Sequence, residues 1–194
     1  MVMNKQQQWQ QAVSEWRQVK DKLGMPIDEG ILELVVGLNL MGFTTSVSCF
    51  GHWDRPVRYP WVGLVGTLEA DELMKQRDEI EQQIQTKYQQ MTDEQVWQRR
   101  EEQGRLWRLA GKLMWPQRRK MWWLLEEFYQ QRRVGGYGVE VIVRGFDGSG
   151  MMLECAGNDF FANLERKQQK QKLQEAQEEF TALGELVKSK WCDG

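Results

Sequence analysis

The segment from Ser48 to Trp61 holds a dense cluster of side chains of reactive and recognition types. It contains the only histidine, His52, and Cys49 lies three residues before it. Reactive and recognition side chains of this kind most often function in loops that a rigid scaffold holds in place. We therefore take this segment as the candidate functional site.

Anion binding is the interpretation that uses most of the segment. Hydroxyl, backbone N–H, imidazole and guanidinium groups suit a phosphate or a carboxylate, and aromatic rings beside them could stack on a base. The predicted ligand-binding residues are Ser48, Cys49, Gly51, His52, Trp53, Asp54, Arg55, Arg58, Tyr59 and Trp61.

Three other interpretations of the same segment stay open. Cys49 and His52 form half of a tetrahedral zinc site, but only Cys155, Cys192 and acids such as Asp54 remain to complete it, so no metal is assigned. A cysteine–histidine nucleophile pair is chemically reasonable if the two side chains face each other. In a purely structural role, Cys49 would be a small buried residue and His52 a hydrogen-bonding latch.

A second feature is the uneven distribution of charge. Residues 97–133 hold ten basic and four acidic side chains together with five of the ten tryptophans, whereas residues 67–96 hold three basic and eight acidic ones. Basic residues interleaved with aromatics can neutralise phosphates and stack on bases. The same pattern fits an antiparallel helix pair in which opposite charges face each other and the tryptophans fill the seam.

The elements before the candidate site are predicted from periodicity. Residues 4–23 have the spacing of an amphipathic helix. Residues 28–41 predict a second helix, buried on nearly all sides, with Asp28 as its N-cap and Gly42 at its C-terminus. Gly30 and Gly37 would let that helix approach another element closely.

The rest of the chain alternates strand and helix signals. Residues 44–49 and 61–65 predict strands, and a long helical region opens after Thr67. A capping box at Thr92–Gln95 predicts the start of another helix, and Pro116 the start of a third. Strands are expected at 139–146 and 151–156, joined by a tight turn at 147–150, and a polar helix at 159–190.

This order predicts an α+β fold. We expect one domain over residues 1–194, with a four-stranded, mainly antiparallel sheet and the helix of residues 28–41 packed against it. Between the two strand pairs, residues 67–133 form a long helical hairpin insertion.

Composition narrows the class of protein. Charged residues make up 28% of the chain and the mean hydropathy is −0.66. No run approaches the roughly 20 apolar residues of a membrane span, the N-terminus lacks the apolar core of a secretory signal, and three cysteines are too few for a disulfide framework. We expect a cytoplasmic protein that does not associate with membranes.

The candidate segment also resembles known families. The residues Gly42, Thr45, Ser48, Cys49, Gly51 and His52 resemble a motif of small, largely uncharacterised proteins of bacteria and their phages. A more distant similarity is to the wybutosine-synthesizing protein 3 family, in which arginine usually follows the glycine where this chain has His52. That similarity implies transfer-RNA methylation with S-adenosylmethionine.

Binding is the function that the sequence favours. We expect a binding protein for a phosphorylated, nucleotide-like ligand or nucleic acid, through the Ser48–Trp61 loop and the basic, tryptophan-rich helix. The alternatives are an enzyme that modifies nucleic acid or nucleotides, methyltransferase-like or based on Cys49 and His52, and a structural or protein-interaction module. The sequence identifies no cofactor and leaves a homo-oligomer open.

Overall fold

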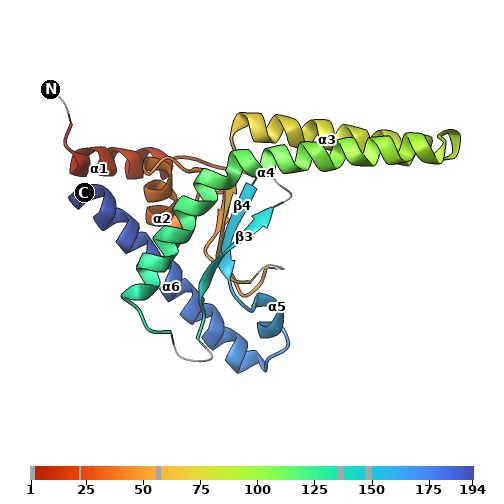
Figure 1. Cartoon of the computed structure of the whole chain (residues 1–194). Helices are drawn as coiled ribbons and strands as arrows, with labels where there is room; N and C mark the ends of the chain where they lie inside the picture. The colour runs from red at the N-terminus through yellow and green to blue at the C-terminus, as the bar shows by residue number, and fades with distance from the viewer. Residues whose placement is uncertain (1–2, 22, 56–57, 135–137, 147–149) are drawn as a thin grey trace.

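The computed structural model describes residues 3–21, 23–55, 58–134, 138–146 and 150–194 (Figure 1). Helices pack on a small sheet, and a pair of long helices projects from it. In chain order the elements are α1 (Lys5–Trp16), α2 (Glu29–Leu40), β1 (Thr44–Cys49), β2 (Trp61–Val65), α3 (Leu68–Lys87), the 3₁₀ turn η1 (Tyr88–Gln90), α4 (Asp93–Gln130), β3 (Val141–Phe146), β4 (Gly150–Cys155), α5 (Asn158–Phe161) and α6 (Arg166–Asp193).

The four strands form one antiparallel sheet in the order β1-β2-β4-β3. Strand β2 therefore pairs with both β1 and β4. Trp61 of β2 lies opposite Cys49 of β1 on one side and opposite Glu154 of β4 on the other. The predicted α+β fold with a four-stranded antiparallel sheet is confirmed. Strand β3 begins at Val141, two residues later than expected, and residues 147–149 of the predicted turn lie outside the described residues.

Helix α2 is buried on nearly all sides, as predicted. Its residues Ile31, Leu34, Val35 and Leu38 belong to the main hydrophobic cluster, together with residues of the sheet, α4 and α6. Leu32 and Val36 on its other side pack with Trp9 of α1.

The two glycines of α2 mark close contacts with its neighbours. A Cβ atom on Gly37 would overlap Val187 of α6, and one on Gly30 would overlap the ring of Phe50. The predicted close approach is confirmed at both positions, and at Gly30 the neighbour is the loop that follows β1.

Helices α3 and α4 pair with opposite charges facing, as in the bond between Arg100 and Glu81. The prediction that tryptophans fill the seam is wrong. All five tryptophans of the basic block lie on the solvent side of α4 and are exposed: Trp97, Trp107, Trp115, Trp122 and Trp123. The seam is formed instead by smaller side chains such as Ile80, Ile84 and Leu106.

Three predicted helix boundaries are wrong. The first helix ends at Trp16 rather than at residue 23, since the N–H groups of Gln18 and Val19 bond to the carbonyls three residues before them, Glu15 and Trp16, instead of four. The last helix is interrupted, since α5 ends at Phe161 and a capping box at Glu165 starts α6.

Pro116 does not start a helix. It lies inside α4, which runs without a break over 38 residues, or about 57 Å. Proline removes one N–H donor from the helix, but Met114 and Met121 are fully buried on either side of it. Tertiary packing on both flanks outweighs the loss of that single bond.

Among the described helices, none is long and apolar enough to cross a membrane.

Candidate functional site

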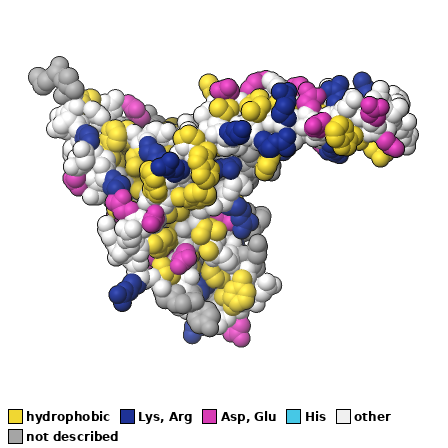
Figure 2. All heavy atoms as spheres, in the orientation of Figure 1, with side chains coloured by type: hydrophobic (Ala, Val, Ile, Leu, Met, Phe, Trp, Pro, Cys, Tyr) yellow, Lys and Arg dark blue, Asp and Glu magenta, His cyan; other side chains and the backbone are white. Residues whose placement is uncertain are grey.

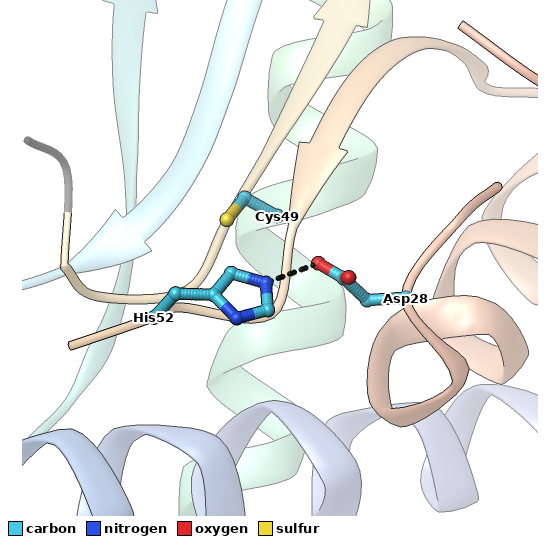
Figure 3. Close-up of side chains that lie close together, drawn as sticks. All are labelled: Asp28, Cys49 and His52. Carbon is cyan, nitrogen blue, oxygen red and sulfur yellow. Dashed lines mark hydrogen bonds and ion pairs between the residues drawn. The ribbon is translucent and has the colours of Figure 1, made fainter. Parts of the chain in front are cut away.

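Asp28 ties the candidate loop to the start of α2. It occupies the N-cap position, as predicted, but its side chain forms no hydrogen bond to the helix. Its Oδ2 atom instead accepts the N–H of Phe50 at 3.0 Å and lies 3.0 Å from Nε2 of His52 (Figure 3). The loop after β1 is therefore held by a carboxylate that precedes it by more than twenty residues.

The environment of Asp28 favours its charged form. Burial would raise the pKa of this carboxyl, but the hydrogen bonds from Phe50 and His52 and the nearby charges of His52 and Arg55 together lower the pKa below its ordinary value. Asp28 is therefore an anionic hydrogen-bond acceptor at neutral pH.

Gly51 sets the path of the loop. Its φ angle is +85°, a conformation that favours glycine, and a Cβ atom there would lie 2.6 Å from the carbonyl oxygen of Arg58. Its carbonyl accepts a hydrogen bond of 3.1 Å from the Gln177 side chain of α6. Gly51 therefore lies against the backbone of Arg58 and is hydrogen-bonded to α6.

Cys49 lies at the end of β1 and is buried, with 5% of its surface exposed. Its Sγ atom accepts the Gly51 N–H at 3.4 Å, and the guanidinium of Arg55 lies 3.9 Å away. Ligand atoms of Asp28, Cys49 and His52 all lie within 4.8 Å of one another. The Asp28 and His52 side chains point toward each other in Figure 3, with the thiol beside them.

Trp53 is the centre of a second cluster, made of cations. Arg58, from the same loop, lies 4.9 Å from the centre of its ring, and Arg166 and Lys170 of α6 each lie 5.5 Å from it. Gln169 positions Arg58, since its amide oxygen accepts from the guanidinium while its amide NH₂ donates to the Ala162 and Leu164 carbonyls.

The cations of α6 are poorly compensated within the described part of the fold. Neither Arg166 nor Lys170 forms an ion pair with another described residue, and both are exposed. The carboxylate at this helix end is that of the N-cap Glu165, which accepts the N3 backbone N–H, and the first turn itself contains no acidic residue. Positive charge near a helix N-terminus is unfavourable because it meets the positive end of the helix dipole. A bound anion would relieve this repulsion.

The remaining predicted site residues do not gather at one point. Ser48 is half-buried and lies opposite Val62, one step along β1 from Cys49, so the two side chains point to opposite faces of the sheet. Asp54 is exposed at the loop surface, and Trp61 is half-buried on β2. Tyr59 is buried, and its ring packs 5.4 Å from that of Phe161, as a core residue does.

Asp28, Arg166 and Lys170 are charged residues that the structure brings to the loop and that were absent from the predicted site, as were the amides of Gln169 and Gln177. Asp28 was predicted as a helix N-cap from the sequence, and its backbone does occupy that position. The N-cap pattern does not indicate where the carboxylate points. Arg166 and Lys170 lie in a run of charged residues that is typical of a solvent-exposed helix face. Only the contact between the loop and the start of α6 distinguishes them from other surface cations.

No protein-family model, curated protein or solved structure matches this chain.

Proposed function

We propose that this chain binds a phosphorylated, nucleotide-like ligand at the Trp53 cluster. The observation that carries the proposal is the convergence of Arg58, Arg166 and Lys170 on one indole ring from two segments more than a hundred residues apart. Guanidinium and ammonium groups are the usual partners of phosphate, and the indole offers a surface for a base.

The fold supports this assignment in two ways. The Gly51 carbonyl and the Arg58 guanidinium are hydrogen-bonded to Gln177 and Gln169 of α6, so that the cations lie close together before any ligand arrives. Arg166 and Lys170 also repel each other at the ring of Trp53, a cost that a phosphate group would offset. His52 faces Asp28, so in this proposal it supports the loop and the cations bind the anion.

Removal of two of the cations should abolish most of the affinity. We expect Arg166→Ala and Lys170→Ala each to weaken binding of ATP and of inorganic pyrophosphate about tenfold or more, because a hydrogen bond to a charged group contributes about 1.5–3 kcal/mol. Isothermal titration calorimetry at low salt measures both probes. If the base of ATP stacks on Trp53, ATP should bind more tightly than pyrophosphate. Trp53→Leu should then reduce the difference between the two affinities.

Lys167→Ala is the matched control. Lys167 is exposed on the same first turn of α6, and no contact of its side chain with Trp53 is present in the described structure. It should change the affinity less than about threefold, since long-range charge alone is screened at the surface. An equal loss in all three alanine variants, or no binding of either probe, contradicts the proposal.

A second candidate function is the binding of single-stranded nucleic acid along α4. Hydrophobic and basic side chains lie next to each other on the surface around α4 (Figure 2), and one such contact joins Arg119 and the ring of the exposed Trp123 at 4.3 Å. Trp115 and Trp122 meet edge to face with ring centres 5.4 Å apart. Exposed rings of this size beside cations suit bases and phosphates.

A fluorescently labelled single-stranded RNA tests this second candidate. We expect binding at about 50 mM salt that weakens steeply toward physiological salt, because counterions are released. Trp115→Ala should weaken it about fivefold to a hundredfold, since stacking on one base is worth about 1–3 kcal/mol. Tyr88→Ala, which removes an exposed ring outside α4, should have no effect. Absence of binding at low salt rejects this candidate.

A further inference from the structure

Asp28, Cys49 and His52 bring together three kinds of metal-ligating atom from two separate parts of the chain. Asp28 stands at the N-cap of α2, Cys49 at the end of β1, and His52 in the loop that follows (Figure 3). In the described part of the chain, these are the residues whose ligand atoms all approach one another within 4.8 Å.

The spacing of these atoms is close to that of a tetrahedral centre. Zinc bonds of about 2.0–2.3 Å to nitrogen, oxygen and sulfur place neighbouring ligand atoms about 3.3–3.8 Å apart. The carboxylate and imidazole atoms are 3.0 Å apart and the whole set lies within 4.8 Å. Small side-chain rotations would therefore place all three atoms at bonding distance from one ion.

We propose that Asp28, Cys49 and His52 bind one divalent transition-metal ion, zinc above all, with a fourth position open to water or a ligand. Carboxylate, imidazole and thiolate are the three ligand types that zinc accepts, whereas magnesium and calcium avoid thiolate. Three protein ligands with an open position are typical of reactive zinc centres rather than of closed structural ones. This site goes beyond the anion-binding function and uses different side chains.

The surroundings of the three ligands are those of a metal site. The Gly51 N–H donates to Cys49 Sγ and the Phe50 N–H donates to Asp28 Oδ2, so backbone groups orient two of the ligands. The guanidinium of Arg55 lies 3.9 Å from Sγ and would repel a bound cation, but this side chain is exposed and has room to turn toward solvent. The side chains of Asp28 and His52 are 26% and 33% exposed, which gives an ion a path from solvent.

The other two cysteines do not belong to this site. Cys155 is completely buried in the core, and burial and nearby carboxylates raise the pKa of its thiol above the ordinary value. Cys192 packs near the C-terminus of α6 against the cluster around Trp9. Asp54, in the same loop, is exposed and not part of the group within 4.8 Å. Cys192 and Asp54 therefore provide controls of matching chemistry.

Cobalt(II) titration of the metal-free protein under reducing conditions tests the proposal. We expect one ion per chain, the intense visible bands of tetrahedral cobalt, a near-ultraviolet band from thiolate-to-cobalt charge transfer, and displacement by one equivalent of zinc. Cys49→Ser should remove the charge-transfer band. Asp28→Asn and His52→Gln keep a hydrogen-bonding group at each position and should weaken zinc binding by about a hundredfold or more. This loss exceeds the ~10–100-fold typical of substituting a residue that only hydrogen-bonds to a metal ligand.

The controls separate this site from adventitious binding. Cys192→Ser and Asp54→Asn should leave zinc affinity within about threefold of the parent protein. Circular dichroism of each variant without metal establishes that it is folded, and zinc should raise the unfolding temperature of the parent but not of the three ligand variants. Failure of the parent protein to bind either ion, or equal affinity in Asp28→Asn and the parent, overturns the proposal. Neither result bears on phosphate binding at Arg166 and Lys170.

Discussion

Gly51→Ala should destabilise the protein by about 3 kcal/mol or more. Alanine in the left-handed region costs about 1–2 kcal/mol by itself. The added Cβ would also lie 2.6 Å from the Arg58 carbonyl oxygen and 2.8 Å from Cδ1 of Leu173, and a backbone carbonyl cannot turn aside as a flexible side chain can. Urea or thermal unfolding monitored by circular dichroism measures the loss.

Gly42→Ala is the matched control for this substitution. Gly42 has nearly the same conformation, with φ at +84°, but a Cβ atom there would meet nothing within 4 Å. It should cost about 1–2 kcal/mol, the conformational part alone. The difference between the two variants isolates the contact of the loop with itself and with α6. Equal losses in both would mean that the loop moves away freely and is not fixed as described.

Substitution of Gly51 should also weaken binding at both proposed sites. Gly51 lies between Cys49 and His52, and its N–H donates to the thiol. Its carbonyl is held by Gln177 on the helix that carries Arg166 and Lys170. A displaced loop would therefore separate the metal ligands from each other and Trp53 from its cations.

The sheet and the helix beneath it could be predicted from sequence because their signals are local. The apolar positions of residues 31–38 repeat at helical spacing, and glycine and proline mark the ends of the strands. The same reasoning failed at Pro116, where packing on both sides of α4 overrides a local helix-start signal. It failed again for the tryptophans, because large apolar side chains were assigned to an interface that smaller residues fill.

The candidate site was only partly predictable for a different reason. The loop from Cys49 to Arg58 is recognisable from its residue types, but its partners come from elsewhere in the chain. Asp28 is 24 residues from His52, and Gln169 is 111 residues from Arg58. Such pairs have no periodicity that a single sequence displays, so neither the carboxylate nor the cations of α6 could be assigned to the loop before the fold placed them there.

Helix α6 carries the side chains that bind the loop, and Phe180 packs this helix into the core. Phe180 is completely buried in the main cluster with Leu34, Leu38 and Leu183. We expect Phe180→Ala to lower the free energy of unfolding by about 3–5 kcal/mol, the usual cost of removing a large buried ring and leaving a cavity. Denaturant unfolding followed by far-ultraviolet circular dichroism gives this value.

Phe160→Ala provides the comparison at a surface position. Phe160 is 64% exposed and meets Phe161 edge to face with ring centres 6.4 Å apart, so its removal should cost less than about 1 kcal/mol. Because α6 carries both the cations at Trp53 and the side chains that hold the loop, the Phe180 variant should also bind pyrophosphate more weakly under conditions where it is still mostly folded. A variant that loses stability but keeps full affinity would show that the start of α6 holds its position without the packing of its centre against α2.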